Sequence, residues 1–342
     1  MLPHNIKSNI SLKKYTTFKI GGPARYFVEV DDLPRLAHVL NWARKNQQKV
    51  FVLGGGSNLL FMDDGFDGLV VKLVNNDLTT SILEEKIEIN CGAGLQLGRL
   101  VQESFKIQAL GLEWAIGIPG KVGGAIRGNA GAFGGEMKNV VKNVQVINFK
   151  SREFRQQKEM KPFVAPNEIK KDIDPFCRNI IDNFSNEDCE FTYRGSIFKE
   201  NPGLLIWAAD FVLQKDTQQL APKIAQDLLR KRREKQPSLT RFPSAGSVFK
   251  NPKVPLEIII KFEHDTETKA RDNKVPAGWL IAQCGLLGKR IGGAMISDFH
   301  GNFIVNVDNA TAQDVLLLIS LIKTKVRNKF NIHLQEEICI VY

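Results

Sequence analysis

The segment Gly111–Glu136 reads GLEWAIGIPGKVGGAIRGNAGAFGGE and holds nine of the 28 glycines of the chain. Alanine, isoleucine, valine and phenylalanine separate these glycines, whereas a flexible linker would carry serine, asparagine or charge. The composition therefore predicts a segment buried in the protein. Glycine lacks a Cβ and adopts positive φ angles, so such a segment can bring backbone N–H groups close to a phosphate or a flat ring. For glycine alone, a tight buried turn is an equally good interpretation.

A second glycine loop, Gly54-Gly55-Gly56-Ser57-Asn58, follows a predicted buried strand at Val50–Leu53. No helix start comes after it, because Leu59-Leu60-Phe61 continues as an extended segment. That order disfavours the dinucleotide-binding Rossmann motif, in which a helix begins directly after the glycines. Two separate glycine loops indicate a bound ligand more strongly than either loop alone.

The length of 342 residues predicts two or three domains, and 43% hydrophobic with 25% charged residues is ordinary for a globular protein. No run is as long as a membrane span, and the first residues lack the apolar core of a signal peptide. The five cysteines are scattered without C-x-x-C spacing, which favours reduced thiols over a zinc or disulfide framework. We expect a cytoplasmic protein with no metal site.

The net charge is +10, from 47 basic and 37 acidic residues. This balance fits a nucleic-acid partner, a small polyanionic ligand or solubility alone. Much of the charge lies in Arg230–Lys235, at the end of a predicted helix, where the helix dipole favours cations. Only four Trp and four Tyr are present, and no nucleic-acid-binding module is recognisable, so we expect no nucleic-acid partner.

Strands and helices alternate along the rest of the chain. Strands are predicted at 26–30, 50–53, 69–73, 86–90, 141–149, 204–213, 291–296, 303–306 and 337–342, and helices at 31–46, 95–106, 222–235, 276–284 and from 311 onward. Asp31-Asp32 and Thr311–Asp314 are candidate helix caps. Residues 151–186 are polar and proline-containing without a clear period, which predicts an insertion outside the core.

Six motifs occur along the chain in one order. They are Thr16–Ala24 (TTFKIGGPA), Val52–Leu60 (VLGGGSNLL), Gly117–Glu136 (GIPGKVGGAIRGNAGAFGGE), Cys189–Phe198 (CEFTYRGSIF), Ser244–Pro252 (SAGSVFKNP) and Leu334–Ile338 (LQEEI). Together they resemble the UDP-N-acetylenolpyruvoylglucosamine reductase (MurB) family, flavoenzymes of peptidoglycan precursor synthesis. The resemblance covers roughly residues 10–150 and 187–342. One glycine motif would be unspecific, whereas six in register are specific.

The resemblance implies an α+β, three-domain flavoprotein with an FAD-binding module of the vanillyl-alcohol-oxidase (PCMH) type and a C-terminal α+β substrate domain. It divides the chain into 1–74 with the returning strand 331–342, then 75–220 with the insertion 151–186, and 221–330. Only Lys215–Ala221 separates the strand 204–213 from the basic helix, so the sequence resembles the shorter class, which lacks a tyrosine-bearing loop there. Two departures are the length of the insertion and Cys339, which stands where such proteins often carry arginine.

The implied reaction is the NADPH-dependent reduction of UDP-N-acetylglucosamine enolpyruvate to UDP-N-acetylmuramate through FAD. Hydride from N5 of the reduced flavin would reach the methylene carbon, and a proton would reach the neighbouring carbon while charge builds on the carboxylate. Such a site needs a flavin, a proton donor, and donors or cations at the carboxylate. We expect a monomer whose partners are these small molecules, with no membrane partner.

Three residues match catalytic positions of the family. Ser247, in the GSVFKN context, matches the proton donor. Arg194, in the YR-x-S motif, matches an arginine whose planar guanidinium suits a carboxylate that gains charge. Glu337 matches the catalytic glutamate in LQEEI. Its neighbour Glu336 is the alternative, but with Glu337 the isoleucines that follow keep strand alternation.

The resemblance also implies residues for the ligands. The FAD pyrophosphate is expected at Gly54, Gly55, Gly56, Ser57 and Asn58, and the isoalloxazine and ribityl chain at Gly117, Ile118, Pro119, Gly120, Gly123, Gly124, Asn129, Ala130 and Gly131. Candidates for the UDP-sugar are Arg232, Lys235 and Asn251, and Lys235 is also a candidate cation for the Ser247 alkoxide. The turn His300-Gly301-Asn302 is a further segment that could face the site, but a lone loop histidine is more often structural, so His300 is not a candidate site residue.

One alternative is a flavoprotein of the same binding fold that acts on another substrate. It would share the glycine loops, but GSVFKNP and YR-x-S argue against it. The other alternative, a non-enzymatic nucleic-acid binder, rests only on the net charge of +10.

Overall fold

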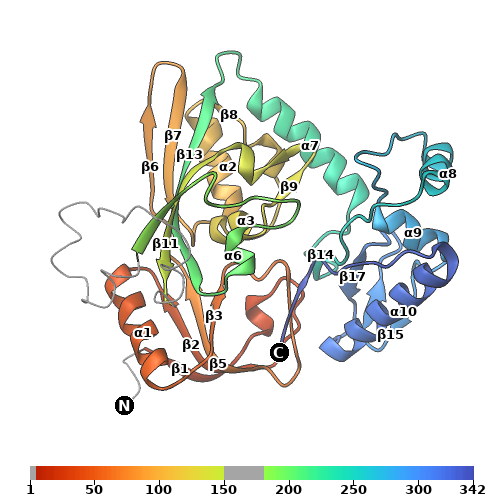
Figure 1. Cartoon of the computed structure of the whole chain (residues 1–342), viewed down its shortest axis with the longest axis horizontal. Helices are drawn as coiled ribbons and strands as arrows, with labels where there is room; N and C mark the ends of the chain where they lie inside the picture. The colour runs from red at the N-terminus through yellow and green to blue at the C-terminus, as the bar shows by residue number, and fades with distance from the viewer. Residues whose placement is uncertain (1–4, 150–180) are drawn as a thin grey trace. The chain divides into compact units, whose positions relative to one another are not determined.

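The computed structural model describes residues 5–149 and 181–342 (Figure 1). Within these ranges the chain divides into two compact units. Of the described residues, unit 1 contains 5–8, Arg25–Gly55, 67–149 and 181–231, and unit 2 contains Asn9–Ala24, Gly56–Phe66 and Arg232–Tyr342. Each unit therefore combines an N-terminal part of the chain with a later part. The three-domain division implied by the resemblance stays a prediction.

A four-stranded sheet, most of it in unit 1, has the order β1 (Lys7–Ser11), β2 (Pro23–Val30), β5 (Phe66–Leu73) and β3 (Val50–Leu53). Helix α1 (Leu33–Lys45) begins after Asp32, whose carboxylate accepts the backbone N–H of Arg35 at 2.7 Å. The acidic cap predicted from the sequence is therefore confirmed. The helix buries an apolar face in the core of unit 1, made of Leu36, Ala37, Val39, Leu40 and Ala43.

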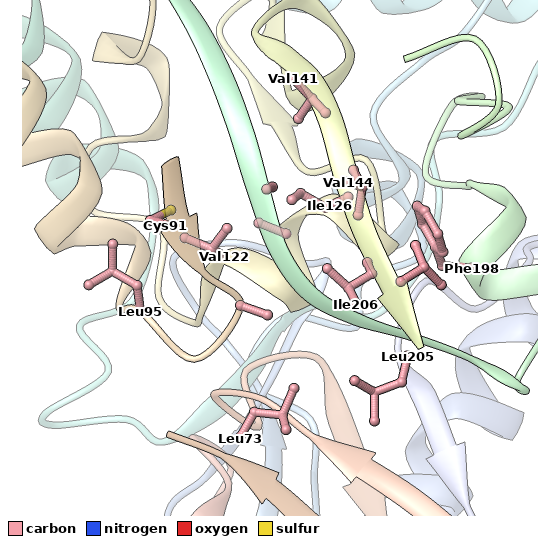
Figure 2. Close-up of a cluster of buried hydrophobic side chains, with 14 of the residues drawn as sticks. Leu73, Cys91, Leu95, Val122, Ile126, Val141, Val144, Phe198, Leu205 and Ile206 are labelled. Atoms are coloured by element: carbon pink, nitrogen blue, oxygen red, sulfur yellow. The ribbon is translucent and has the colours of Figure 1, made fainter. Parts of the chain in front are cut away.

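The second sheet of unit 1 is antiparallel. Its order is β12 (Ile181–Ser185), β11 (Val141–Asn148), β13 (Leu204–Lys215), β7 (Lys86–Gly92) and β6 (Leu78–Ile82), and β8 (Ala109–Leu110) also pairs with β13. Helices α2 (Leu97–Lys106) and α3 (Val122–Arg127) contribute to the same core. Figure 2 shows Cys91 of β7, Val122 and Ile126 of α3, and Val144 of β11 in this cluster.

The predicted insertion 151–186 is wrong at its C-terminal end. Ile181–Ser185 forms β12, which pairs with β11, and Phe184 is completely buried. Its sequence hid the strand because one of the two buried positions on the same face is a carboxylate, Asp182, beside Phe184, so no apolar alternation is visible. The other residues of the predicted insertion, 151–180, lie outside the described part of the chain.

Unit 2 contains an antiparallel sheet in the order β14 (Ser244–Ser247), β17 (Phe303–Asn306), β16 (Ala294–Ile296) and β15 (Arg290–Ile291). Helices α8 (Leu256–Thr266), α9 (Ala277–Gln283) and α10 (Ala312–Phe330) belong to the same unit, and α10 lies against β15 and β16 (Figure 1). The capping box predicted at the start of α10 is confirmed, because Thr311 and Asp314 bond to each other's backbone N–H groups.

The single strand predicted at 291–296 is wrong, since β15 and β16 form a hairpin around Gly292-Gly293. Gly292 has φ 53°, a left-handed conformation that favours glycine. A Cβ on Gly293 would lie 2.0 Å from the carbonyl oxygen of Asp308. Two glycines inside an apolar run therefore marked a turn between two short strands.

The basic helix α7 (Ala221–Lys235) begins soon after β13 ends. Asp216, between them, accepts the N–H groups of Leu220 and Ala221 at 2.8 and 2.7 Å. This carboxylate caps the first turn of α7 and stabilises the short link, and the assignment to the shorter class stays a prediction.

Strand β18 (Cys339–Val341) pairs in parallel with β4 (Leu59–Phe61) in unit 2. The backbone N–H of Cys339 donates to the carbonyl of Asn58 at 2.9 Å. The C-terminal strand thus returns to the N-terminal part of the sequence, directly after the second glycine loop, as the resemblance implies.

Candidate active site

In unit 1 the two glycine loops of the sequence meet. Gly54 and Gly55 follow β3 and lie against Gly120 and Lys121 of the long glycine segment. A Cβ on Gly55 would lie 2.6 Å from the Cα of Gly120, so the backbones touch without side chains between them. A Cβ on Gly54 would have its nearest neighbour, the Cβ of Lys121, at 3.8 Å. A side chain at Gly55 would therefore overlap the protein's own backbone, whereas a Cβ at Gly54 would make only ordinary van der Waals contact.

Helix α3, which the sequence analysis missed, begins inside the long glycine segment. A Cβ on Gly123 would lie 2.9 Å from the Cβ of Ala93, and the N–H of Gly123 donates to the carbonyl of Ala93 at 2.9 Å. A Cβ on Gly124 would meet no atom of the described chain within 4 Å. The absence of a side chain at Gly123 thus allows α3 to pack closely against Ala93. At Gly124 the backbone faces open space.

The other cofactor candidates of this segment lie in the turns on either side of α3. They are Gly117, Ile118, Pro119 and Gly120 before the helix, and Asn129, Ala130 and Gly131 after it. Gly117 and Gly120 have φ of 71° and 122°, conformations that favour glycine. Ala130 donates its N–H to the carbonyl of Ala125 at 2.8 Å, and Gly131 opens a short hairpin of β9 (Gly131–Ala132) and β10 (Gly135–Glu136).

Asn129 is buried and uses its side chain inside the protein. Its Nδ2 donates to Oε2 of Glu136 and to the carbonyl of Thr192, each at 3.0 Å, and its Oδ1 accepts the N–H of Lys138 at 3.0 Å. The bond to Thr192 joins the glycine segment to the YR-x-S loop. Asn129 therefore supports the loop that carries Arg194, a structural role that the sequence analysis did not include.

Arg194 lies in unit 1 with a left-handed backbone, φ 59°. Its carbonyl accepts from Nζ of Lys199 at 3.0 Å, and its guanidinium lies 5.4 Å from the ring centre of Tyr193. The hydroxyl of Ser196 donates to the carbonyl of Arg127, at the end of α3, at 2.7 Å. The structure thus brings the Arg194 loop next to the glycine segment of the same unit.

In unit 2 the second glycine loop continues toward the C-terminal strand. A Cβ on Gly56 would lie 2.1 Å from the carbonyl oxygen of Tyr15, so this glycine too serves close backbone contact. Ser57 is half-buried, and Asn58 is exposed. The Nδ2 of Asn58 donates to the backbone carbonyl of Glu337 at 3.1 Å. A predicted cofactor residue and a predicted catalytic residue therefore lie together.

Ser247 also lies beside Glu337 in unit 2. It ends β14, pairs with Phe303 of β17, and is partly exposed. The next residue, Val248, accepts the backbone N–H of Glu337 at 2.7 Å. Two of the three predicted catalytic residues, separated by most of the C-terminal third of the sequence, thus sit on bonded neighbouring segments.

The structure distinguishes the two glutamates of LQEEI. The carboxylate of Glu336 accepts from Nζ of Lys323 on α10 at 2.8 Å. Glu336 therefore forms an ion pair with a helix of its own unit. This supports the choice of Glu337, whose role stays a prediction.

The predicted substrate residues have different surroundings. Oδ1 of Asn251 accepts the N–H of Ala277 at 3.0 Å and so caps α9. Arg232 is half-buried, its Nη1 donates to Oε1 of Gln236 at 3.4 Å, and burial lowers its pKa. Lys235 is exposed at the end of α7, and in the described chain no hydrogen bond or ion pair joins it to Ser247. Its proposed partnership with Ser247 stays a prediction.

Two buried polar residues near the glycine loops were not found from the sequence. Oδ1 of Asn75 accepts the N–H of Gly94 at 3.0 Å, and its Nδ2 donates to the carbonyl of Trp207 at 2.8 Å. Nζ of Lys121 donates to the carbonyl of Leu73 at 2.8 Å, and burial lowers the pKa of this lysine. Both hold backbone that flanks the glycine loops. Lys121 lay in a quoted motif, but only its contacts reveal the role.

Cys91 is a free cysteine buried in unit 1. Burial raises the pKa of the Cys91 thiol to about 12, so it stays protonated at neutral pH. Residues 5–149 and 181–342 contain no group of three His, Cys, Asp or Glu side chains that could hold a metal ion. Among the described helices, none has the length and apolar character needed to cross a membrane.

Two family matches cover most of the chain. Residues 24–153 match the FAD binding domain, and residues 236–341 match the C-terminal domain of UDP-N-acetylenolpyruvoylglucosamine reductase. The first match contains both glycine loops, and the loops fit FAD. The open backbone at Gly124 leaves room that a side chain would fill, as close approach to a cofactor requires. The predicted α+β flavoprotein fold and the FAD cofactor are confirmed.

Similar proteins support the same assignment over the whole length. A UDP-N-acetylenolpyruvoylglucosamine reductase of Syntrophomonas wolfei is 34% identical over 99% of this chain and 96% of its own, and one of Alkaliphilus metalliredigens is 36% identical over 96% and 91%. The crystal structure of the reductase (MurB) from Thermus caldophilus matches with a TM-score of 0.70 and 29% identity, over 99% of both chains. The chain therefore belongs to the UDP-N-acetylenolpyruvoylglucosamine reductase family of FAD-dependent oxidoreductases.

Proposed function

We propose that the protein reduces the enolpyruvyl ether of UDP-N-acetylglucosamine enolpyruvate to the lactyl ether of UDP-N-acetylmuramate, with NADPH as the reductant, as a cytoplasmic monomer. Similar proteins over nearly the full length carry the name of this reductase. The observation that carries the proposal is in unit 2, where Val248 accepts the N–H of Glu337 directly after Ser247. A hydroxyl and a carboxylate are thereby held on adjacent segments.

FAD, when bound, would supply the hydride chemistry that links NADPH to the methylene carbon of the substrate. The chain's part is to hold the cofactor. Backbone N–H groups of Gly54–Asn58 are proposed to bind the pyrophosphate, and Gly117–Gly124 with Asn129–Gly131 to lie along the ring and ribityl chain. The open backbone at Gly124 supports this, because a side chain there would occupy the ligand's space.

Ser247 is proposed to hold the proton that reaches the neighbouring carbon of the enolpyruvyl group. Among the described residues its hydroxyl makes no hydrogen bond, so its proton is available to a ligand. A serine is a poor acid, and a cation must stabilise the alkoxide that remains. Lys235 is the proposed cation, and its exposed position on α7 leaves its side chain able to turn toward a bound substrate.

Arg194 and Glu337 complete the proposed catalytic set. The guanidinium of Arg194 would hold the substrate carboxylate as charge builds on it, since a planar fork of donors matches two carboxylate oxygens. Glu337 is held through its backbone by Val248 and by Asn58, so its carboxylate starts from a fixed point beside Ser247. Fixed groups stabilise a transition state better than mobile ones.

The UDP moiety is proposed to bind Arg232, Lys235 and Asn251. Arg232 remains a cation despite the lowering of its pKa, because a guanidinium is protonated far above neutral pH. Asn251 uses Oδ1 to cap α9, which fixes the plane of the amide. Its Nδ2 is the group proposed to donate to the sugar nucleotide.

The visible spectrum of the purified protein tests the proposal. We expect a flavin spectrum that NADPH bleaches and that the enolpyruvyl sugar nucleotide restores, with NADH as the comparison for the reductant. A flavin spectrum that NADPH bleaches but this substrate fails to restore would indicate a flavoenzyme with another substrate. A colourless protein that binds no added FAD would refute the proposal.

A further inference from the structure

Asn302 forms hydrogen bonds with Val248 and Phe249, the two residues directly after Ser247, and we call these two residues the clamped segment. Asn302 is only 3% exposed, and both atoms of its amide bond to the backbone of Phe249. Its Oδ1 accepts the N–H of Phe249 at 2.9 Å, and its Nδ2 donates to the carbonyl of Phe249 at 2.8 Å. The backbone carbonyl of Asn302 also accepts the N–H of Val248 at 2.8 Å. Because Phe249 is completely buried, water cannot replace these bonds.

The clamped segment is directly linked to two proposed catalytic residues, Ser247 and Glu337. Ser247 lies one residue before it, and the carbonyl of Val248 accepts the N–H of Glu337 at 2.7 Å. Further along, the N–H of Lys250 donates to the carbonyl of Gln335 at 2.9 Å. The clamped segment and Lys250, which follows it, thus form backbone hydrogen bonds with Gln335 and Glu337, while Asn302 bonds to the other backbone groups of the segment. A displacement of the segment would move both Ser247 and Glu337.

The turn that carries Asn302 is itself fixed. The N–H of Asn302 donates to Nδ1 of His300 at 3.2 Å. A Cβ on Gly301 would lie 2.6 Å from the carbonyl oxygen of Gly278 in α9, so this turn lies against the helix. The same helix is capped by Asn251, which follows the clamped segment. These hydrogen bonds and this close contact connect the turn, the clamped segment and α9 within unit 2.

We infer that Asn302 is a positioning residue that sets Ser247 and Glu337 at their working distance for protonation of the substrate. This inference rests on the proposed role of Ser247. A small displacement of a reacting group slows an oriented reaction strongly, on the order of 10²-fold for 1 Å. Reduction of the flavin by NADPH requires no proton on a substrate carbon, so it does not depend on this geometry.

The first test is Asn302→Ala, studied in the FAD-loaded enzyme by stopped-flow measurement of both half-reactions. We expect reoxidation by the enolpyruvyl substrate to slow by about 10-fold or more, from loosened orientation. Reduction by NADPH should stay within about 2-fold, because that step shares no oriented group with the clamp. Equal slowing of both half-reactions would show a general structural defect and overturn the inference.

Asn306→Ala is the matched control. Asn306 lies on β17 close to Asn302, and its amide also makes two bonds, accepting from the N–H of Ala310 at 2.9 Å and donating to the carbonyl of Phe18 at 3.2 Å. These bonds join segments other than the one after Ser247. The control should lower the melting temperature and leave the ratio of the two half-reaction rates unchanged. A selective loss of reoxidation in this control as well would overturn the inference.

A double variant shows whether Asn302 acts through Ser247. If it does, Ser247→Ala combined with Asn302→Ala should be no slower in reoxidation than Ser247→Ala alone, because the positioned group is already absent. Multiplied losses would show that Asn302 acts independently of Ser247, and would overturn its role in setting the distance between Ser247 and Glu337. Wild-type reoxidation in Ser247→Ala alone would refute the proposed role of Ser247. A selective defect in Ser247→Ala with a wild-type Asn302→Ala would overturn only the positioning.

Asn302→Asp keeps the test decisive if Asn302→Ala fails to fold. The neutral acid of the new side chain can donate one hydrogen bond and accept another, as the amide does with Phe249, whereas the ionised form lacks a donor for the carbonyl of Phe249. The reoxidation rate of this variant relative to wild type should therefore rise as the pH falls. His300, whose Nδ1 accepts the N–H of residue 302, is present in both proteins, so the ratio compares enzymes that differ only in the side chain at residue 302. A ratio independent of pH would overturn the inference.

Discussion

The glycine loops of unit 1 and the Ser247 segment of unit 2 use their residues in opposite ways. At Gly124 the useful groups are backbone atoms, and the absence of a side chain leaves space beside them. At Ser247 the useful group is a side chain, and bonds to the next residues, Val248 and Phe249, hold it in place. The glycine loops depend on the absence of a side chain, whereas the Ser247 segment depends on the hydrogen bonds of the residues that follow it.

The glycines themselves divide into two kinds, which a motif does not distinguish. Gly55 and Gly123 are closed in by Gly120 and Ala93, whereas Gly124 faces no atom of the described chain. Substitution at the first kind damages the fold, and substitution at the second kind damages only what the loop binds. Loss of FAD from a glycine variant is therefore informative only beside the stability of its cofactor-free form.

The largest expected effect is at Ser247. Ser247→Ala should slow reoxidation by the enolpyruvyl substrate at least about 10²-fold, the loss of a positioned acid. Substrate binding should weaken by only about 0.5–1.5 kcal/mol, the contribution of one hydrogen bond. Flavin reduction by NADPH should be nearly unchanged, and Ser247→Cys should retain more activity because a thiol also donates a proton. Stopped-flow spectroscopy separates the steps, and equal slowing of both would assign the proton to another group.

The next effect contrasts the two glutamates of unit 2. Glu337→Gln should lower the rate of substrate reduction by up to about 10²-fold if its carboxylate takes part in proton handling. Glu336→Gln should leave that rate unchanged and lower the unfolding free energy by no more than about 1 kcal/mol, because its partly exposed pair with Lys323 is screened by water. Steady-state assays and urea unfolding of both variants measure the contrast. Greater loss of activity in Glu336→Gln would reverse the assignment.

The glycine contrast predicts two phenotypes. Gly55→Ala should lower the unfolding free energy of the FAD-free protein by about 1–3 kcal/mol, because its Cβ would overlap backbone that cannot move freely. Gly124→Ala should keep or raise it, by up to about 1 kcal/mol, since alanine suits a helix better than glycine.

Yet Gly124→Ala should bind FAD more weakly than wild type. Thermal unfolding of the FAD-free proteins and FAD titrations distinguish the two phenotypes. If Gly124→Ala binds FAD as tightly as wild type, the open space beside α3 belongs to no cofactor.

The smallest effect concerns the start of α10. The backbone N–H groups of Thr311 and Gly293 bond to the carboxylate of Asp314 and lower its pKa. A lowered native pKa means that the unfolded state binds the proton first. The contribution is therefore present above the unfolded pKa, about 3.9, and disappears as the pH falls through the native value.

Asp314→Asn should therefore remove about 1 kcal/mol or less at pH 7, the scale of a helix cap exposed to solvent. At a pH below the native pKa of Asp314, the variant and the wild type should have the same urea midpoint if no other group changes. A difference between the two proteins that is independent of pH would show that the charge of Asp314 contributes nothing.

Local structure followed directly from the sequence. The caps at Asp32 and Thr311, and the strands Val50–Leu53 and Phe303–Asn306, were predicted because short-range patterns of polar and apolar residues fix them. The six motifs in register identified the family, which the comparisons confirmed. These features depend on residues that are neighbours in the chain.

Tertiary structure alone decided how those motifs are used. Sequence could not separate Gly55 from Gly124, because the atoms that close in on Gly55 belong to a loop more than sixty residues later. It could not show that Asn251 caps α9 or that Asn302 clamps Phe249, since both depend on distant backbone. An asparagine or a glycine reads the same in the sequence whatever its role in the structure. Its burial and its bonding partners, which only the folded chain sets, decide its role.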